Sequence, residues 1–160
     1  MKISKLTLLG IILSLTLATT TLALPNGAGP AEKATGEVWT TNPVGKVHHF
    51  WFNAHKEMGN RPAKGYAALR NYLQGETEVN RAIDIEVDTV EVDGNTAYFS
   101  GLVVYDNFNQ RLGDRLYFYV EDNGTPGREG DMIQWGWTVG PPLSFTGQIY
   151  EGNLVTHTYE

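Results

Sequence analysis

The stretch that decides the fold reads Ile83-Asp84-Ile85-Glu86-Val87-Asp88-Thr89-Val90-Glu91-Val92-Asp93-Gly94-Asn95-Thr96. Its apolar side chains alternate with polar ones, which is typical of a strand with one buried face. The apolar positions are odd-numbered up to Val87 and even-numbered from Val90 on, so the buried face switches near Asp88-Thr89. A bulge, or a strand that passes round a barrel corner, produces such a switch. Asp93-Gly94-Asn95 then predicts a tight hairpin, because these residues tolerate turn conformations.

Alternating stretches and turn residues continue on both sides of this hairpin. Residues 50–55 alternate in the same way, and residues 65–72 favour a strand over a short helix. Further reversals are predicted at Asp106-Asn107, at residues 122–127 and at residues 140–142. Closing such a meander removes the unpaired edges that invite aggregation. The sequence therefore predicts an all-β fold, an antiparallel meander of about eight to nine strands closed into a small β-barrel, with a β-sandwich as the alternative.

The N-terminal residues predict export. A basic start is followed by an apolar run from Leu6 to Leu17 and by Thr21-Leu22-Ala23, whose small residues suit a signal peptidase. An uncleaved membrane anchor is the alternative, because the run approaches the length that spans a bilayer. We expect residues 1–23 to be a signal peptide, residues 24–35 a flexible lead-in and residues 36–160 a single antiparallel β domain, which places the protein outside the cell or in the cell envelope.

The composition excludes several classes of protein. The chain has no cysteine, which rules out disulfides, thiolate metal sites and a lipidated cysteine after the apolar run. It has 12 Lys and Arg against 18 Asp and Glu, a net charge of −6, and loss of Lys2 and Lys5 with the signal peptide would make it more acidic. Such a surface repels phosphate backbones and anionic lipids, so we expect no nucleic-acid partner and no membrane partner after signal cleavage.

Histidines and carboxylates give little support for a metal site. His49 and His55 share one face of a predicted strand but lie roughly 20 Å apart at about 3.3 Å per residue, and His48 points to the other face. Asp122, Asn123, Glu129 and Asp131 carry the oxygens that calcium prefers, yet their order follows no known calcium loop, and turn stabilisation is the favoured role. The sequence predicts no metal and no cofactor.

A short repeat lies in the C-terminal half. Gly113-Asp114-Arg115-Leu116-Tyr117-Phe118 is followed, seventeen residues on, by Gly130-Asp131-Met132-Ile133-Gln134-Trp135. We interpret the two copies as consecutive hairpin arms. Each copy begins with a glycine that we expect to adopt an unusual φ. The aspartate that follows it is expected to accept hydrogen bonds from the backbone amides of the turn.

Aromatic residues of these arms are the candidate ligand-binding residues. Trp135 and Trp137 share one face of a predicted strand, and Tyr117 and Tyr119 share one face of the preceding strand. If the two pairs lie side by side across the ladder, they form a platform that stacks on sugar rings or closes over an apolar ligand. The alternative is that these rings fill the core of a small domain without disulfides.

Three segments resemble those of a group of small secreted prokaryotic β domains. They are Gly94-Asn95-Thr96-Ala97, residues 122–127 with Asp131, and Gly152-Asn153-Leu154-Val155-Thr156-His157. The chain is similar in these segments to post-COAP-like domains, and the likeness extends loosely to residues 36–56. Glu151 before Gly152 and Thr158 after His157 depart from the pattern. The resemblance implies an exported β domain and transfers no catalytic residue.

The sequence carries no catalytic signature. It has no Gly-x-Ser-x-Gly elbow, no phosphate loop and no His-Glu-x-x-His. The leading hypothesis is a non-enzymatic binding or interaction domain for carbohydrate or for a small apolar ligand. One alternative is a barrel enzyme, an isomerase or cyclase, that uses Tyr or His with a carboxylate at the mouth of its pocket. Another is a structural subunit whose sheet edge pairs with neighbours. The oligomeric state stays open.

Overall fold

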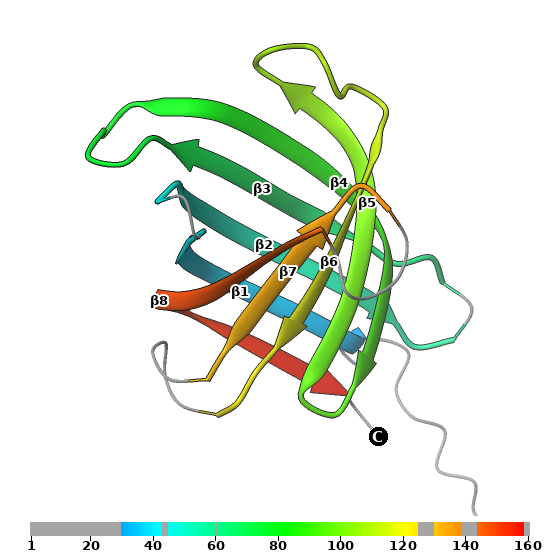
Figure 1. Ribbon diagram of the computed structural model, residues 1–160. Coiled ribbons are helices and arrows are strands. Elements are labelled where there is room, and N and C mark those ends of the chain that lie inside the picture. The colour runs from blue at the N-terminus through cyan, green and yellow to red at the C-terminus, as the bar shows by residue number, and fades with distance from the viewer. Residues whose placement is uncertain (1–29, 43–44, 60, 125–129, 139–143, 159–160) are drawn as a thin grey trace, which may run out of the picture.

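The chain folds into one closed antiparallel β-barrel (Figure 1). The computed structural model describes residues 30–42, 45–59, 61–124, 130–138 and 144–158. Each strand pairs with the next, and β8 pairs with β1, so the barrel is confirmed and the sandwich is excluded. The strands are β1 (Pro30–Thr41), β2 (Val47–Glu57), β3 (Lys64–Tyr72), β4 (Val79–Asp93), β5 (Thr96–Asp106), β6 (Arg115–Glu121), β7 (Met132–Gly136) and β8 (Phe145–Thr158).

The barrel begins earlier than the sequence predicts. Strand β1 starts at Pro30, whereas the sequence predicts that the domain starts near Gly36. Lys33, Ala34 and Thr35 pair with both β2 and β8, and Ala34 is fully buried. Residues 30–35 are therefore part of the barrel and not of a lead-in. The predicted signal peptide and residues 24–29 lie outside the described residues.

The bulge predicted in β4 is confirmed. The pairing of β4 with β5 shifts between Val87 and Thr89, and the buried positions change from odd to even across Asp88. Gly101 lies opposite Val87 on β5. A Cβ atom at Gly101 would lie 2.0 Å from the backbone oxygen of Glu86, so the two strands approach too closely here for any side chain.

The predicted hairpin is also confirmed. Asp93 pairs with Thr96, which leaves Gly94 and Asn95 as a two-residue turn. Gly94 has a φ of 58°, as the first central position of a type II′ turn requires. Residues 65–72 lie within β3 and are not helical. The reversal expected at residues 140–142 lies outside the described residues.

Aromatic and branched side chains fill the barrel. Phe118 stacks on Phe99 with ring centres 4.7 Å apart and meets Phe50 edge to face at 6.1 Å. An eight-stranded barrel encloses little more space than its own inward side chains occupy. Among the described residues, the rings of Phe50, Phe99 and Phe118 fill this part of the interior.

One end of the barrel, called the mouth here, carries the segments that join β1 to β2, β3 to β4, β5 to β6 and β7 to β8. The opposite end carries the Gly94 hairpin and the outer ends of β1 and β8 (Figure 1). Within the described part of the chain there is no helix with the length and hydropathy to cross a membrane.

Candidate functional site

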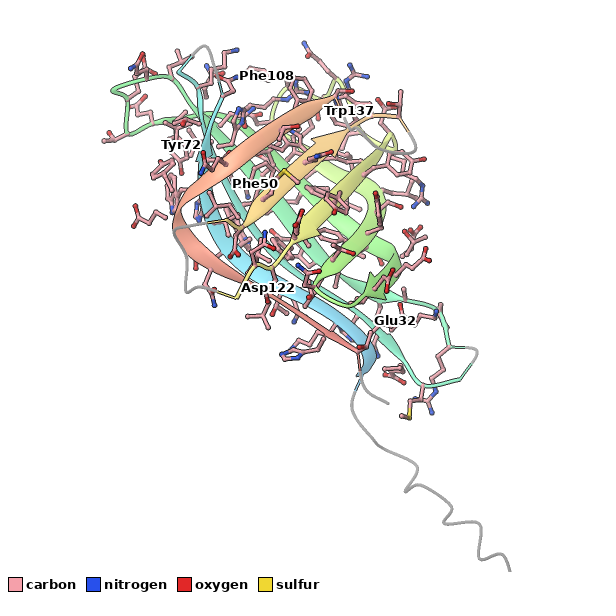
Figure 2. The ribbon with its side chains drawn as sticks, turned by 60° about the horizontal axis from the view of Figure 1, so that its bottom comes forward. Glu32, Phe50, Tyr72, Phe108, Asp122 and Trp137 are labelled. Atoms are coloured by element: carbon pink, nitrogen blue, oxygen red, sulfur yellow. The ribbon has the colours of Figure 1, made fainter. Side chains whose placement is uncertain are left out.

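A cavity of about 170 Å³ opens at the mouth. Trp135, Trp137 and Phe145 form its aromatic wall, and His48 and Arg81 are among its polar lining residues. A second cavity of about 260 Å³ adjoins it, since Arg81 lines both. Figure 2 shows Trp137 and Phe108 at this end of the barrel, away from Glu32 and Asp122. The mouth therefore combines an apolar wall with a few convergent polar groups, as ligand sites usually do.

His48 lies at the bottom of the mouth. It is 5 % exposed. Its side chain points into the barrel, because it lies on the same face of β2 as Phe50 and Phe52. Its Nδ1 donates a hydrogen bond to Oδ1 of Asn71 at 2.6 Å. With the proton on Nδ1, the Nε2 atom is an acceptor. Nε2 is buried and has no hydrogen-bond partner among the described residues.

Burial lowers the pKa of His48, and nearby Lys46 lowers it further, although the hydrogen bond to Asn71 opposes both. The ring is therefore neutral at physiological pH. A neutral imidazole with an unpaired Nε2 is a hydrogen-bond acceptor, and His48 lines the mouth cavity. The sequence favoured a solvated or core role for His48 over a metal-ligand role and did not single it out as a binding residue, although its place on the same strand face as Phe50 already indicated an inward position.

The lowered pKa of His48 predicts a loss of stability in mild acid. In the unfolded chain the His48 imidazole is protonated near pH 6.5. In the folded chain it is protonated only at a lower pH, because its pKa is lowered. The free energy of unfolding therefore falls as the pH drops below about 6.5, by at most about 1.4 kcal/mol per pH unit for each such histidine. Urea denaturation across this pH range should show a smaller slope for His48→Gln than for the unchanged protein. Part of the slope should remain, because burial also lowers the pKa of His49. Equal slopes would contradict the prediction.

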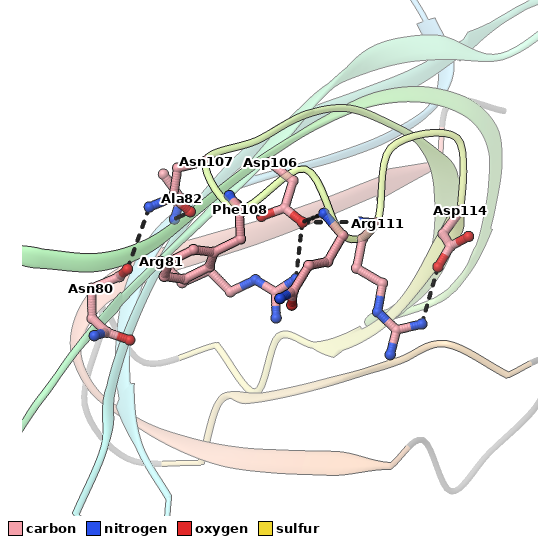
Figure 3. Close-up of polar contacts among 9 residues, drawn as sticks. Asn80, Arg81, Ala82, Asp106, Asn107, Phe108, Arg111 and Asp114 are labelled. Atoms are coloured by element: carbon pink, nitrogen blue, oxygen red, sulfur yellow. Dashed lines mark hydrogen bonds and ion pairs between the residues drawn. The ribbon is translucent and has the colours of Figure 1, made fainter.

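Asp106 anchors the loop between β5 and β6 at the rim of the mouth (Figure 3). Its buried carboxylate accepts hydrogen bonds from the Arg81 guanidinium at 3.0 Å and from the backbone amides of Phe108, Gln110 and Arg111. Burial alone would raise the pKa of Asp106, but the hydrogen bonds from Arg81 and from these amides outweigh burial and lower it. The Asp106 carboxylate is thus ionised, and both of its oxygens accept hydrogen bonds.

Asn107 fastens the same loop to the start of β4. Its backbone amide donates to the Ala82 carbonyl at 3.1 Å, and its side-chain oxygen accepts from the Ala82 amide at 3.0 Å. Further along the loop, the Arg111 guanidinium lies 4.7 Å from the centre of the Trp137 ring. The loop therefore holds one of the two tryptophans of the mouth in place.

The structure separates the four candidate ligand-binding residues. Trp135 lies opposite Phe118 and is 3 % exposed, so it points inward. Tyr119 lies opposite Gln134, and Tyr117 and Tyr119 are half-buried on the outer face of β6. The prediction that the tryptophans and the tyrosines lie side by side is wrong, because residues opposite each other across a ladder share a face and Trp135 is not opposite a tyrosine. Trp135 and Trp137 belong to the mouth, while Tyr119 packs on Tyr98 with ring centres 4.7 Å apart.

The Asp and Asn residues of the turn after β6 stabilise the backbone. Asp131 accepts from the Asn123 amide at 2.8 Å, and Asp122 accepts from the amides of Gly124 and Thr156. Gly113 and Gly130, which open the two copies of the repeat, have φ values of 80° and 113°. The expected turn roles of Asp122, Asp131, Gly113 and Gly130 are confirmed, whereas the carboxylate of Asp114 accepts a hydrogen bond from the Arg111 guanidinium. Glu129 lies outside the described residues, and no group of three acidic or histidine side chains in the described part is placed to hold a metal ion.

The fold and the site define an eight-stranded up-and-down barrel with an aromatic mouth. No protein-family model, no curated protein and no solved structure matches the chain. The likeness to post-COAP-like domains therefore stays a prediction from the sequence.

Proposed function

We propose that the protein is an exported binding protein whose mouth takes a small aromatic anion that also carries a hydroxyl group. The observation that carries this proposal is the cavity whose lining combines three aromatic side chains with His48, whose buried Nε2 atom has no hydrogen-bond partner among the described residues. Aromatic walls with few polar groups favour a flat apolar ring over a large polar ligand.

The volume of the cavity sets the size of the ligand. It holds about 170 Å³, and a cavity of roughly 150 Å³ in another protein is known to take up benzene. One aromatic ring therefore fits in the cavity against Trp135, Trp137 and Phe145, of which Trp135 and Phe145 stack on each other with ring centres 5.7 Å apart. The adjoining cavity of about 260 Å³ leaves room for a polar substituent beside Lys46 and Arg81.

The polar groups of the mouth set the chemistry of that substituent. Nε of Arg81 is a buried donor with no partner among the residues described, and no ion pair involves the Lys46 ammonium within the same residues. Both groups favour an anionic acceptor such as a carboxylate. His48 Nε2 instead needs a donor such as a phenolic hydroxyl. A buried polar atom without a partner costs about 1–3 kcal/mol, which a matching ligand would offset.

The two other hypotheses have less support. A barrel enzyme would need a carboxylate that reaches His48, but Asp106, the buried carboxylate at this end, has both oxygens engaged by Arg81 and the loop amides. A subunit that assembles through a sheet edge needs an unpaired edge strand, and in the closed barrel every strand has two neighbours. Binding at the mouth therefore stays the leading proposal.

Titration with 4-hydroxybenzoate, followed by tryptophan fluorescence and calorimetry, tests the proposal. We expect saturable binding, weaker binding of benzoate, which lacks the donor for His48, and weaker binding of 4-hydroxybenzyl alcohol, which lacks the charge. Trp137→Ala should weaken binding at least about tenfold, the loss expected when a large aromatic contact is truncated. Tyr119→Ala, on the outer face, should leave binding unchanged. Absence of binding by all three compounds, or equal binding by Trp137→Ala, would overturn the proposal.

A further inference from the structure

A second hollow lies on the outer surface of the barrel, between β1 and β8. It has a volume of about 370 Å³ and is lined by Glu37, Trp39, Glu151, Gly152 and Asn153. None of these residues lines the mouth cavities. Trp39 and Glu37 point outward here, because the neighbouring Val38 is fully buried inside the barrel. The hollow is therefore a separate site.

The Trp39 ring forms a rigid wall of this hollow. On the side of β2, the His49 ring stacks on it with centres 3.9 Å apart and an angle of 3° between the planes. Tyr72 adds a tilted contact at 5.5 Å, and Nε2 of His49 is held by Oε1 of Glu37 at 3.0 Å. Strand β8 lies on the other side of β1, where the hollow opens. One face of the indole is thus packed and the other is turned toward the hollow.

Gly152, which lines the hollow, marks a close approach of β1 and β8. It lies opposite Val38 on β1 with a φ of 105°, and a Cβ atom there would lie 2.0 Å from the backbone oxygen of Glu37. No side chain can occupy this position without moving the strands apart. At Gly152 the lining of the hollow is therefore bare backbone.

Acidic and amide groups surround the aromatic wall. The Glu37 side chain is 70 % exposed, and Glu151 and Asn153 are exposed next to it. The described lining of the hollow includes no lysine or arginine. Two carboxylates repel anions, while carboxylates and an indole face both attract cations. A suitable ligand thus combines an apolar ring face with a positive charge and hydroxyl groups.

We propose that this hollow binds an amino-bearing pyranose unit of a polysaccharide. The C–H face of the sugar ring lies on the free face of Trp39. The ammonium group lies near Glu37 and Glu151, and the sugar hydroxyls meet the Asn153 amide. This site is independent of the mouth, so neither proposal depends on the other.

Calorimetric titration with a glucosamine hexamer tests the proposal, with N-acetylglucosamine hexamer and oligogalacturonate as comparison ligands. We expect the amino sugar to bind best, the acetylated sugar more weakly and the uronic acid not at all. Trp39→Ala should weaken binding about tenfold, and Trp39→Phe should retain part of it. Glu151→Gln, a surface change that leaves the fold intact, should weaken binding of the glucosamine hexamer but not binding of the N-acetylglucosamine hexamer.

Tyr119→Ala is the matched control, because it removes an outer aromatic ring from β6, which pairs with neither β1 nor β8. It should bind the glucosamine hexamer as the unchanged protein does, and Trp39→Ala should still bind 4-hydroxybenzoate. Equal affinity for the amino sugar and the uronic acid would overturn the proposal. So would unchanged binding by a folded Trp39→Ala, or a preference for oligolysine over the sugar.

Discussion

Replacing Asp106 by alanine is expected to lower the free energy of unfolding by about 3–5 kcal/mol, the usual cost of removing one partner of a buried ion pair. The Asp106 side chain is fully buried and neutralises the partly buried Arg81. Its loss leaves the guanidinium without its carboxylate and releases the amides of Phe108, Gln110 and Arg111. Urea denaturation at neutral pH measures the loss.

The pH dependence of stability gives the same prediction a second readout. Because the pKa of Asp106 is lowered in the folded state, its contribution is fully present above the unfolded value of about 3.9 and is lost as the pH falls through the folded value. The difference between the unchanged protein and Asp106→Ala should therefore shrink in strong acid.

Asp114→Ala is the control for this prediction. Asp114 pairs with Arg111 at 3.0 Å in the same loop, but both side chains are more than two-fifths exposed. Exposed pairs contribute between about 0 and 1 kcal/mol. If Asp106→Ala and Asp114→Ala lowered the free energy of unfolding by similar amounts, the prediction would be wrong, because burial of the Asp106 carboxylate would not increase its contribution to stability.

Much of the fold could be predicted because its decisive signals are local. The alternation from Ile83 to Val92 indicates both the strand and the bulge. Each apolar side chain faces the core, so a change in the spacing of apolar residues marks the place where the buried face switches. Gly94 and Asn95 likewise mark their turn by their own conformational freedom. Closure of the barrel followed from the general cost of open edges.

The start of the barrel could not be predicted in the same way. Residues 30–35 combine proline, alanine, glutamate, lysine and threonine and show no strong strand signal. They are strand residues because β2 and β8 lie on both sides and pair with their backbone. Backbone pairing of this kind is a tertiary effect that overrides local propensity.

The candidate site could likewise be predicted from the sequence only in part. Parity within a strand correctly groups Trp135 with Trp137 and Tyr117 with Tyr119, but it does not tell which pair faces inward. That depends on the register of β6 against β7, which places Phe118 opposite Trp135. The outer hollow depends on the register of β1 against β8, which no local pattern specifies.

Phe118→Ala is expected to lower the free energy of unfolding by about 3–5 kcal/mol, the range for large aromatic truncations in a core. Phe118 is 1 % exposed and contacts Phe99 and Phe50, so its removal leaves a cavity that the closed barrel cannot collapse to fill. Tyr119→Ala, one residue on, removes a ring that lies on the outer face and packs against Tyr98. Its expected cost is about 1 kcal/mol, close to the value of an exposed aromatic pair. Thermal and urea denaturation of both variants compare the two faces directly, and a larger loss for Tyr119→Ala would mean that β6 presents the opposite face to the core.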